Sequence, residues 1–234
     1  MVFKKRKTAW HYLLYALGEI LLIIIGILIA VKINESVKQA EVAELRCTYL
    51  NELLYTFDYD IEDVEGNLRA LDKWIPKIRS VFDGLQYDSL ATVDSLHEKL
   101  GTVGNFIFFG QRSKTKIEEL KFSPVNLIEN RDLKNRILLY EDDKVSFIRL
   151  IERKYELIGE DLRQYYARNF RGFSYGPAVP LDIEVVAEDP YYFSLVLERL
   201  RMNYNLEDHY EALNDEQKAI RGLILEEIEK TCRD

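Results

Sequence analysis

Histidines are the residues from which a catalytic or metal-binding site would most readily be built, and the chain has three. His97 follows Asp94 at a helical spacing, His209 adjoins Asp208, and His11 borders a long apolar segment. Carboxylate-bridged metal sites in helical bundles need repeated Glu-x-x-His pairs with further glutamates, and this pattern does not occur in the sequence. We therefore expect no metal, no cofactor and no enzymatic activity.

Phosphate and nucleic-acid chemistry also lack support. The eleven glycines form neither a G-x-G-x-x-G run nor a P-loop. The first seven residues contribute +4 to the net charge of −8, which leaves −12 for the rest of the chain. Binding to nucleic acid requires clustered lysine and arginine, so an acidic chain of this kind is expected to bind none.

Two cysteines, Cys47 and Cys232, stand 185 positions apart, a distance unlike any familiar metal-binding spacing. In an oxidising compartment they would form a disulfide if the first and last helices were antiparallel neighbours. The other reading is that each is a small apolar residue of a helix, because free cysteine behaves as a buried hydrophobic residue. We favour this second reading and leave the pairing open.

Aromatic residues gather in two loop-like regions and could form a surface for a partner or a small ligand. The residues of this surface are Phe106, Phe108, Phe109, Tyr175, Tyr191 and Tyr192. The phenylalanines belong to the apolar run 105–109, and the tyrosines flank a glycine- and proline-containing loop. We favour burial of the phenylalanines, because exposed apolar patches are unusual. For the tyrosines we favour packing at the edge of a bundle, with the ring packed and the hydroxyl in water.

The longest apolar segment, residues 12–31, lies near the N-terminus and has Glu19 as its only formal charge. Twenty helical residues span roughly 30 Å, which is the thickness of the hydrocarbon core of a bilayer. We therefore predict a transmembrane helix over residues 11–33. It would separate a cytoplasmic basic tail, residues 1–10, from an extracytoplasmic domain, residues 34–234.

Charged and aromatic residues flank this segment and would anchor it in the bilayer. They are Lys4, Lys5, Arg6, Lys7, Trp10 and Lys32. Basic residues favour the cytoplasmic side, which would place the main domain in the periplasm of a Gram-negative cell, anchored to the inner membrane. A cleaved signal peptide is the competing reading, but its apolar region usually runs only about 7–15 residues. We favour the uncleaved anchor.

Glu19 is costly at membrane depth unless it is protonated, paired or turned toward protein. On a helix it shares a face with Gly26 and Ala30, a small-xxx-small pair that lets another helix approach closely. Together with Gly18 these residues would form a face for transmembrane association. The alternative is that Glu19 reaches water at the interface and the small residues are incidental, and both readings stay open.

The span also resembles a known pattern. The segment YLLYALGEILLIIIGILIAVKIN, residues 12–34, looks like the signature "YaiGEi…viGIliAlqInnw" of a family of single-span proteins of Gram-negative bacteria. The matching positions are Gly18, Glu19, Gly26, Ile27 and Ala30. Residues 126–140 are similar to a second family segment, whereas Lys32 and Glu35-Ser36 depart from the usual residues. The resemblance implies an inner-membrane protein with an exterior helical domain and supplies no chemistry.

Helical periodicity dominates the exterior chain. Apolar residues recur at steps of three and four from Leu50 to Ile75, with Pro76 expected to kink or end that helix. Asn130 and Asp189-Pro190 are strong helix starts. We expect a solvated bend at residues 141–143, a weakly strand-like segment at 183–187 and a separate helical run from Leu213 to Ile228. The predicted fold is mostly α, a single transmembrane helix that continues into a bundle of three or four long helices.

These patterns favour a membrane-anchored, non-catalytic interaction or scaffold protein, whose partner would be a membrane or periplasmic protein or a second copy of the chain. The alternative is a single-span sensor that binds a small ligand in its exterior bundle. Such a sensor would need a membrane partner, because a cytoplasmic tail of about ten residues is far below the size of a domain.

Overall fold

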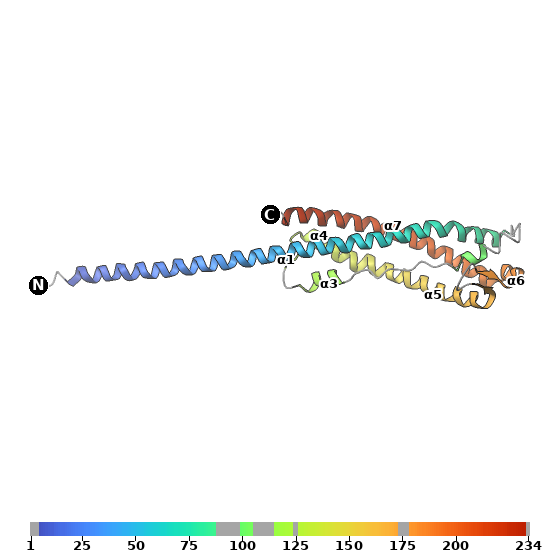
Figure 1. Cartoon of the computed structure of the whole chain (residues 1–234), viewed down its shortest axis with the longest axis horizontal. Helices are drawn as coiled ribbons and strands as arrows, with labels where there is room; N and C mark the ends of the chain where they lie inside the picture. The colour runs from blue at the N-terminus through green and yellow to red at the C-terminus, as the bar shows by residue number, and fades with distance from the viewer. Residues whose placement is uncertain (1–4, 88–98, 105–114, 124–125, 173–177, 233–234) are drawn as a thin grey trace.

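The computed structural model describes residues 5–87, 99–104, 115–123, 126–172 and 178–232. Within these ranges the chain is almost entirely helical, as the sequence predicts, and three long helical rods lie side by side (Figure 1). One rod extends far beyond the other two at its N-terminal end (Figure 1). Most of the packing of the domain therefore takes place along the C-terminal half of that rod.

Helix α1, Lys5–Gln86, is that extended rod and contains 82 residues. At 1.5 Å per residue it is about 120 Å long. Neither glycine nor proline interrupts it between Asn34 and Gly66. Pro76 lies inside the helix, which continues for ten more residues, so of the two predicted outcomes, a kink or an end, the end is wrong. Packing of Ile75 and Ile78 in the core stabilises the helix on both sides of the proline.

Helix α7, Pro190–Thr231, runs antiparallel to α1. Ion pairs show the direction, because Asp58 of α1 contacts Arg221 and Glu65 contacts Lys218. The run after Leu213 is not a separate helix, since α7 is continuous over 42 residues. Residues 205–212 contain neither glycine nor proline, and nothing in them stops helix propagation.

The third rod consists of α4, Arg131–Leu139, the π-helix η1, Tyr140–Val145, and α5, Ser146–Asn169. The bend expected at residues 141–143 is wrong. A π-turn takes up one more residue than an α-turn, and here it lets both Tyr140 and Val145 reach the core. Glu141 is also buried and accepts a hydrogen bond from Arg149 at 3.3 Å.

The end of the bundle farthest from the N-terminus carries two short strands and a short helix (Figure 1). Strands β1, Phe170–Arg171, and β2, Val179–Pro180, pair antiparallel, and α6, Ile183–Glu188, follows. The strand-like reading of residues 183–187 is wrong, because Asp182 caps a helix there by accepting hydrogen bonds from the next turn. Near the ladder, a Cβ on Gly101 would lie only 2.1 Å from the carbonyl oxygen of Ala178, so this backbone contact requires glycine.

The core begins at Tyr49 and joins all three rods. Leucine and isoleucine dominate it, together with several fully buried tyrosines. Helix α3, Thr115–Phe122, contributes Ile117 and Leu120 to this core. No residue from 12 to 41 takes part in the packing, because every one of them is exposed.

The start of α7 offers a local test of these packing arguments. Asp189 accepts a hydrogen bond from the backbone amide of Tyr191 and a second, at 2.7 Å, from the hydroxyl of Tyr165. Asp189→Ala removes both and should lower the free energy of unfolding by about 1–2 kcal/mol. Asp189→Asn keeps one acceptor oxygen, which can still cap the backbone amide of Tyr191, and replaces the other with an NH2 group that can only donate, so it should lower the free energy of unfolding less. Urea unfolding followed by circular dichroism measures both, and equal losses for the two variants would contradict this role.

Candidate functional site

The apolar N-terminal part of α1 stands apart from the bundle. Its most apolar 18-residue window has a mean hydropathy of 2.7, and none of that window is buried. Among the described helices it is the one with the length and composition to cross a membrane. A core helix of a soluble protein meets the same criteria of length and composition, but its apolar side chains are mostly inside the fold.

The predicted association residues all lie on this exposed stretch. Ideal Cβ atoms on Gly18 and Gly26 would have no heavy atom within 4 Å apart from the local helix. Glu19 and Ala30 are exposed on the same stretch. The structure therefore leaves the face open, with space for the close approach of another helix.

The predicted anchoring residues flank the exposed stretch. Lys5, Arg6 and Lys7 begin α1, and Trp10 has 63% of its surface exposed. Lys32 is exposed at the other end. Lys4 lies outside the described residues.

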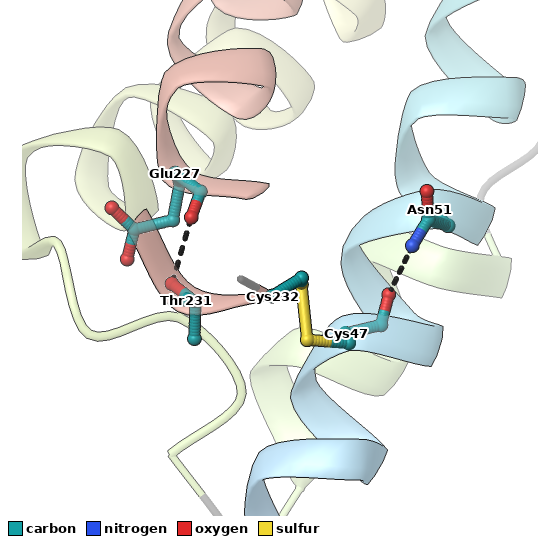
Figure 2. Close-up of a disulfide and its surroundings, with 5 residues drawn as sticks. All are labelled: Cys47, Asn51, Glu227, Thr231 and Cys232. Atoms are coloured by element: carbon teal, nitrogen blue, oxygen red, sulfur yellow. Dashed lines mark hydrogen bonds between the residues drawn. A yellow bond between two sulfur atoms is a disulfide. The ribbon is translucent and has the colours of Figure 1, made fainter. Parts of the chain in front are cut away.

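A disulfide between Cys47 and Cys232 closes the end of the bundle nearest this stretch (Figure 2). The Cα atoms are 5.6 Å apart, and the bond joins α1 to the residue that follows α7. The favoured reading of two unpaired apolar cysteines is therefore wrong. In the sequence, one cysteine stands near the start of the predicted exterior chain and the other near its end. This placement is compatible with a disulfide between antiparallel helices, but the spacing alone does not distinguish a disulfide from two unpaired residues.

Tyrosines gather at the opposite end of the bundle, but mostly inside it. Tyr192 is completely buried and donates a hydrogen bond to the carbonyl oxygen of Leu100 at 2.8 Å, so it does not lie on a surface. Tyr166 is buried beside it and stacks on Phe170 with ring centroids 4.1 Å apart. Tyr191 is exposed. Phe106, Phe108, Phe109 and Tyr175 of the expected surface lie outside the described residues.

Burial gives these tyrosines a predictable effect at alkaline pH. Desolvation raises the pKa of Tyr166 and Tyr192 well above the usual value near 10. Above pH 10 the unfolded chain loses these protons and the folded chain keeps them, so stability must fall as the pH rises. For each of the two tyrosines, the free energy of unfolding should fall by about 1.4 kcal/mol for every pH unit above 10. A titration that follows tyrosinate absorbance and helix content together tests this, and ionisation of both near pH 10 without unfolding would contradict it.

A buried arginine lies between α5 and α7. The guanidinium carbon of Arg199 is 3.7 Å from the ring centroid of Tyr155, and the same guanidinium donates a hydrogen bond to the Tyr155 hydroxyl. Burial lowers the pKa of Arg199 to about 10, which leaves it charged at neutral pH. The Arg199 side chain is only 1% exposed and does not reach solvent. Its cation–π contact with the ring of Tyr155 therefore stabilises the packing of α5 on α7.

The outer face of α1 carries two exposed aromatic residues that the sequence analysis did not single out. Tyr55 has 74% and Tyr59 has 53% of its surface exposed, one helical turn apart. Glu41, Glu44 and Glu62 are exposed on the same side of the helix. Helical periodicity could have identified this face, because Tyr55 stands about half a turn from the buried Leu53.

Two shallow grooves lie between α5 and α7. One, of about 290 Å³, is lined by Phe147, Leu150, Lys154 and Met202 among others. The second, of about 350 Å³, adjoins it at Phe147 and reaches His209, whose ring meets that of Phe147 edge-on at 5.0 Å. These volumes are near the lower limit for a small-molecule site.

The described residues contain no group of three or more histidine, cysteine or acidic side chains placed to hold a metal ion. His209 contacts an aromatic ring, and His97 with its neighbour Asp94 lies outside the described residues. No known protein family, curated protein or solved structure matches the chain.

Proposed function

We propose that the chain is a single-span membrane protein whose domain, residues 34–234, lies outside the cytoplasm and binds another protein. Residues 11–33 form the anchor, with the N-terminus in the cytoplasm of a bacterial cell and the domain in the periplasm. The protein works as a non-catalytic interaction or scaffold component. Its partner is a membrane or periplasmic protein.

The exposure of the apolar stretch is the observation that carries the proposal. Burial of a large apolar side chain is worth about 1.5–3 kcal/mol, and residues 12–31 are almost all apolar and exposed. Leaving them in water would therefore cost tens of kcal/mol by the same measure. A bilayer removes that cost, and a continuous helix satisfies every backbone hydrogen bond within it.

The disulfide supports the placement of the domain. Disulfides form and persist in oxidising compartments such as the bacterial periplasm and are rare in the cytosol. Cys47 follows residue 33 by 14 positions, about 21 Å along the helix. The bond therefore lies beyond the proposed span, on the side that the basic N-terminal tail assigns to the exterior.

A fusion experiment tests the proposal directly. Alkaline phosphatase joined to the C-terminus should be active, because that enzyme folds only outside the cytosol, and a fluorescent protein that folds only in the cytosol should stay dark. The fused protein should remain in the membrane after extraction with alkaline carbonate. An active cytosolic reporter would overturn the topology, and a soluble protein that begins near residue 31 would show a cleaved signal peptide instead.

A ligand sensor is the second candidate, and the grooves between α5 and α7 favour it. They are lined by both apolar and charged residues, including Phe147, Lys154 and Glu198. A ligand there would contact both rods and could change their packing. Thermal unfolding of the wild type and of Phe147→Ala in the presence of a panel of small metabolites would show whether any compound stabilises the wild type alone.

A further inference from the structure

We infer that the outer face of α1 binds a helix of a second membrane protein that carries basic residues just outside the bilayer. This inference rests on the proposed function, because it requires residues 11–33 to lie in the membrane. The surface consists of Glu19, Gly26 and Ala30 within the span and Glu41, Glu44, Tyr55, Tyr59 and Glu62 beyond it. We call these residues the outer face.

Helix α1 is one continuous helix (Figure 1), so helical periodicity places the residues of the outer face on one side of it. An α-helix repeats about every 3.6 residues, so positions 36 apart stand about ten turns apart and face the same way. Glu19 and Tyr55 have this relation, and so do Gly26 and Glu62. The span and the bundle therefore present one continuous strip.

That strip faces away from the bundle. Val64 is completely buried, and it follows Tyr55 by nine residues, which is about two and a half turns and thus the opposite side of the helix. Tyr55 and Tyr59 are exposed. The named residues of the outer face are all exposed, so none of the described helices covers them, although α3 approaches beside them through the ion pair between Lys116 and Glu52.

The charges on the outer face select the partner. Glu41, Glu44 and Glu62 are exposed and have no ion pair within the described part of the chain. In a parallel pair of two copies anchored in one bilayer, each glutamate would stand opposite its own counterpart, and such like-charge contacts are destabilising. Lysine or arginine on a different chain would instead complement the two glutamates that lie about 12 and 17 Å beyond residue 33.

The aromatic residues complete the surface farther from the membrane. Tyrosine is enriched at protein interfaces because its ring supplies apolar area while its hydroxyl tolerates water. Tyr55 and Tyr59 lie about 33 and 39 Å from residue 33 along the helix. A partner helix that continues outside the membrane for this length would reach both rings.

The test uses the full-length protein in phosphatidylcholine vesicles with a fluorophore at its C-terminus. The probe is a synthetic single-span helix that continues outside the bilayer to the level of Tyr59 and carries an acceptor fluorophore and two lysines level with Glu41 and Glu44. A matched peptide carries glutamates at those two positions. Energy transfer should show about three- to tenfold tighter binding of the lysine peptide. Glu41→Lys with Glu44→Lys should reverse the preference, whereas Asp161→Lys with Glu211→Lys, the same charge change elsewhere, should not.

Three further measurements decide the outcome. Tyr55→Ser with Tyr59→Ser should weaken the binding of both peptides. Equal affinity for the two peptides would overturn the inference, and energy transfer between two differently labelled copies without peptide would show that a second copy occupies the face. Flotation of the vesicles measures the anchor separately: a protein that does not float contradicts the proposed function, while one that floats without a peptide preference contradicts the outer face alone.

Discussion

Loss of the disulfide should destabilise the domain more than any single surface substitution. The bond between Cys47 and Cys232 joins residues 185 positions apart, and a cross-link that closes so long a loop restricts the unfolded chain strongly. The double substitution Cys47→Ala with Cys232→Ala should lower the free energy of unfolding by about 2–5 kcal/mol. Urea unfolding of the full-length protein in detergent micelles, followed by circular dichroism, measures this loss.

The same titration contains its own control. Without the cross-link the unfolded chain exposes more surface, so the dependence of the unfolding free energy on urea should become steeper. The single variant Thr231→Ala, which removes a side-chain hydrogen bond to the carbonyl of Glu227 beside the disulfide, should cost about 1 kcal/mol or less and leave the slope unchanged. Identical unfolding midpoints for the wild type and the double variant would contradict the structural role of the bond.

Local sequence signals predicted the elements that depend on local chemistry. Asn130 and Asp189 were identified as helix caps, and both accept hydrogen bonds from the first turn of their helices. The periodic apolar stripe that starts at Leu50 lies in the core as expected. Each of these features is decided by residues within a few positions of one another, which is why sequence alone was sufficient.

Features that depend on contacts between distant residues were not predictable in the same way. Three acidic residues at 141–143 look like a solvated bend, but burial of Tyr140 and Val145 against the other rods holds that segment in a π-helix. Tyr192 follows an exposed tyrosine in the sequence, yet its hydroxyl bonds to Leu100, 92 residues away. Tertiary packing decided these outcomes against the local pattern.

The structure also separates two kinds of polar residue on α1 that the sequence shows as one pattern. Asp58 and Glu65 turn toward α7 and form ion pairs with Arg221 and Lys218. Glu41 and Glu44 lie before the bundle begins and remain exposed. The first pair is explained by packing within the domain, whereas Glu41 and Glu44 form no ion pair among the described residues and are left for the partner helix inferred above.

Charges placed in the middle of the span should have the second large effect, on the location of the whole protein. Leu21 and Ile25 lie one turn apart near the centre of residues 11–33, on the side of the helix away from Glu19. Arginine at the centre of a membrane helix costs about 2.5–3.5 kcal/mol on insertion scales, so Leu21→Arg with Ile25→Arg should oppose insertion by roughly 6 kcal/mol. Leu21→Ala with Ile25→Ala is the uncharged control and should remain in the membrane fraction.

The span variant also tests whether insertion and disulfide formation are linked. A chain that fails to insert keeps Cys47 and Cys232 in the reducing cytosol, where the bond should not form. Alkylation of free thiols should therefore modify the arginine variant, while the wild type and the alanine control stay protected. If the arginine variant were soluble with an intact disulfide, the bond would form without export, and the argument that places the domain outside the cytoplasm would lose its second support.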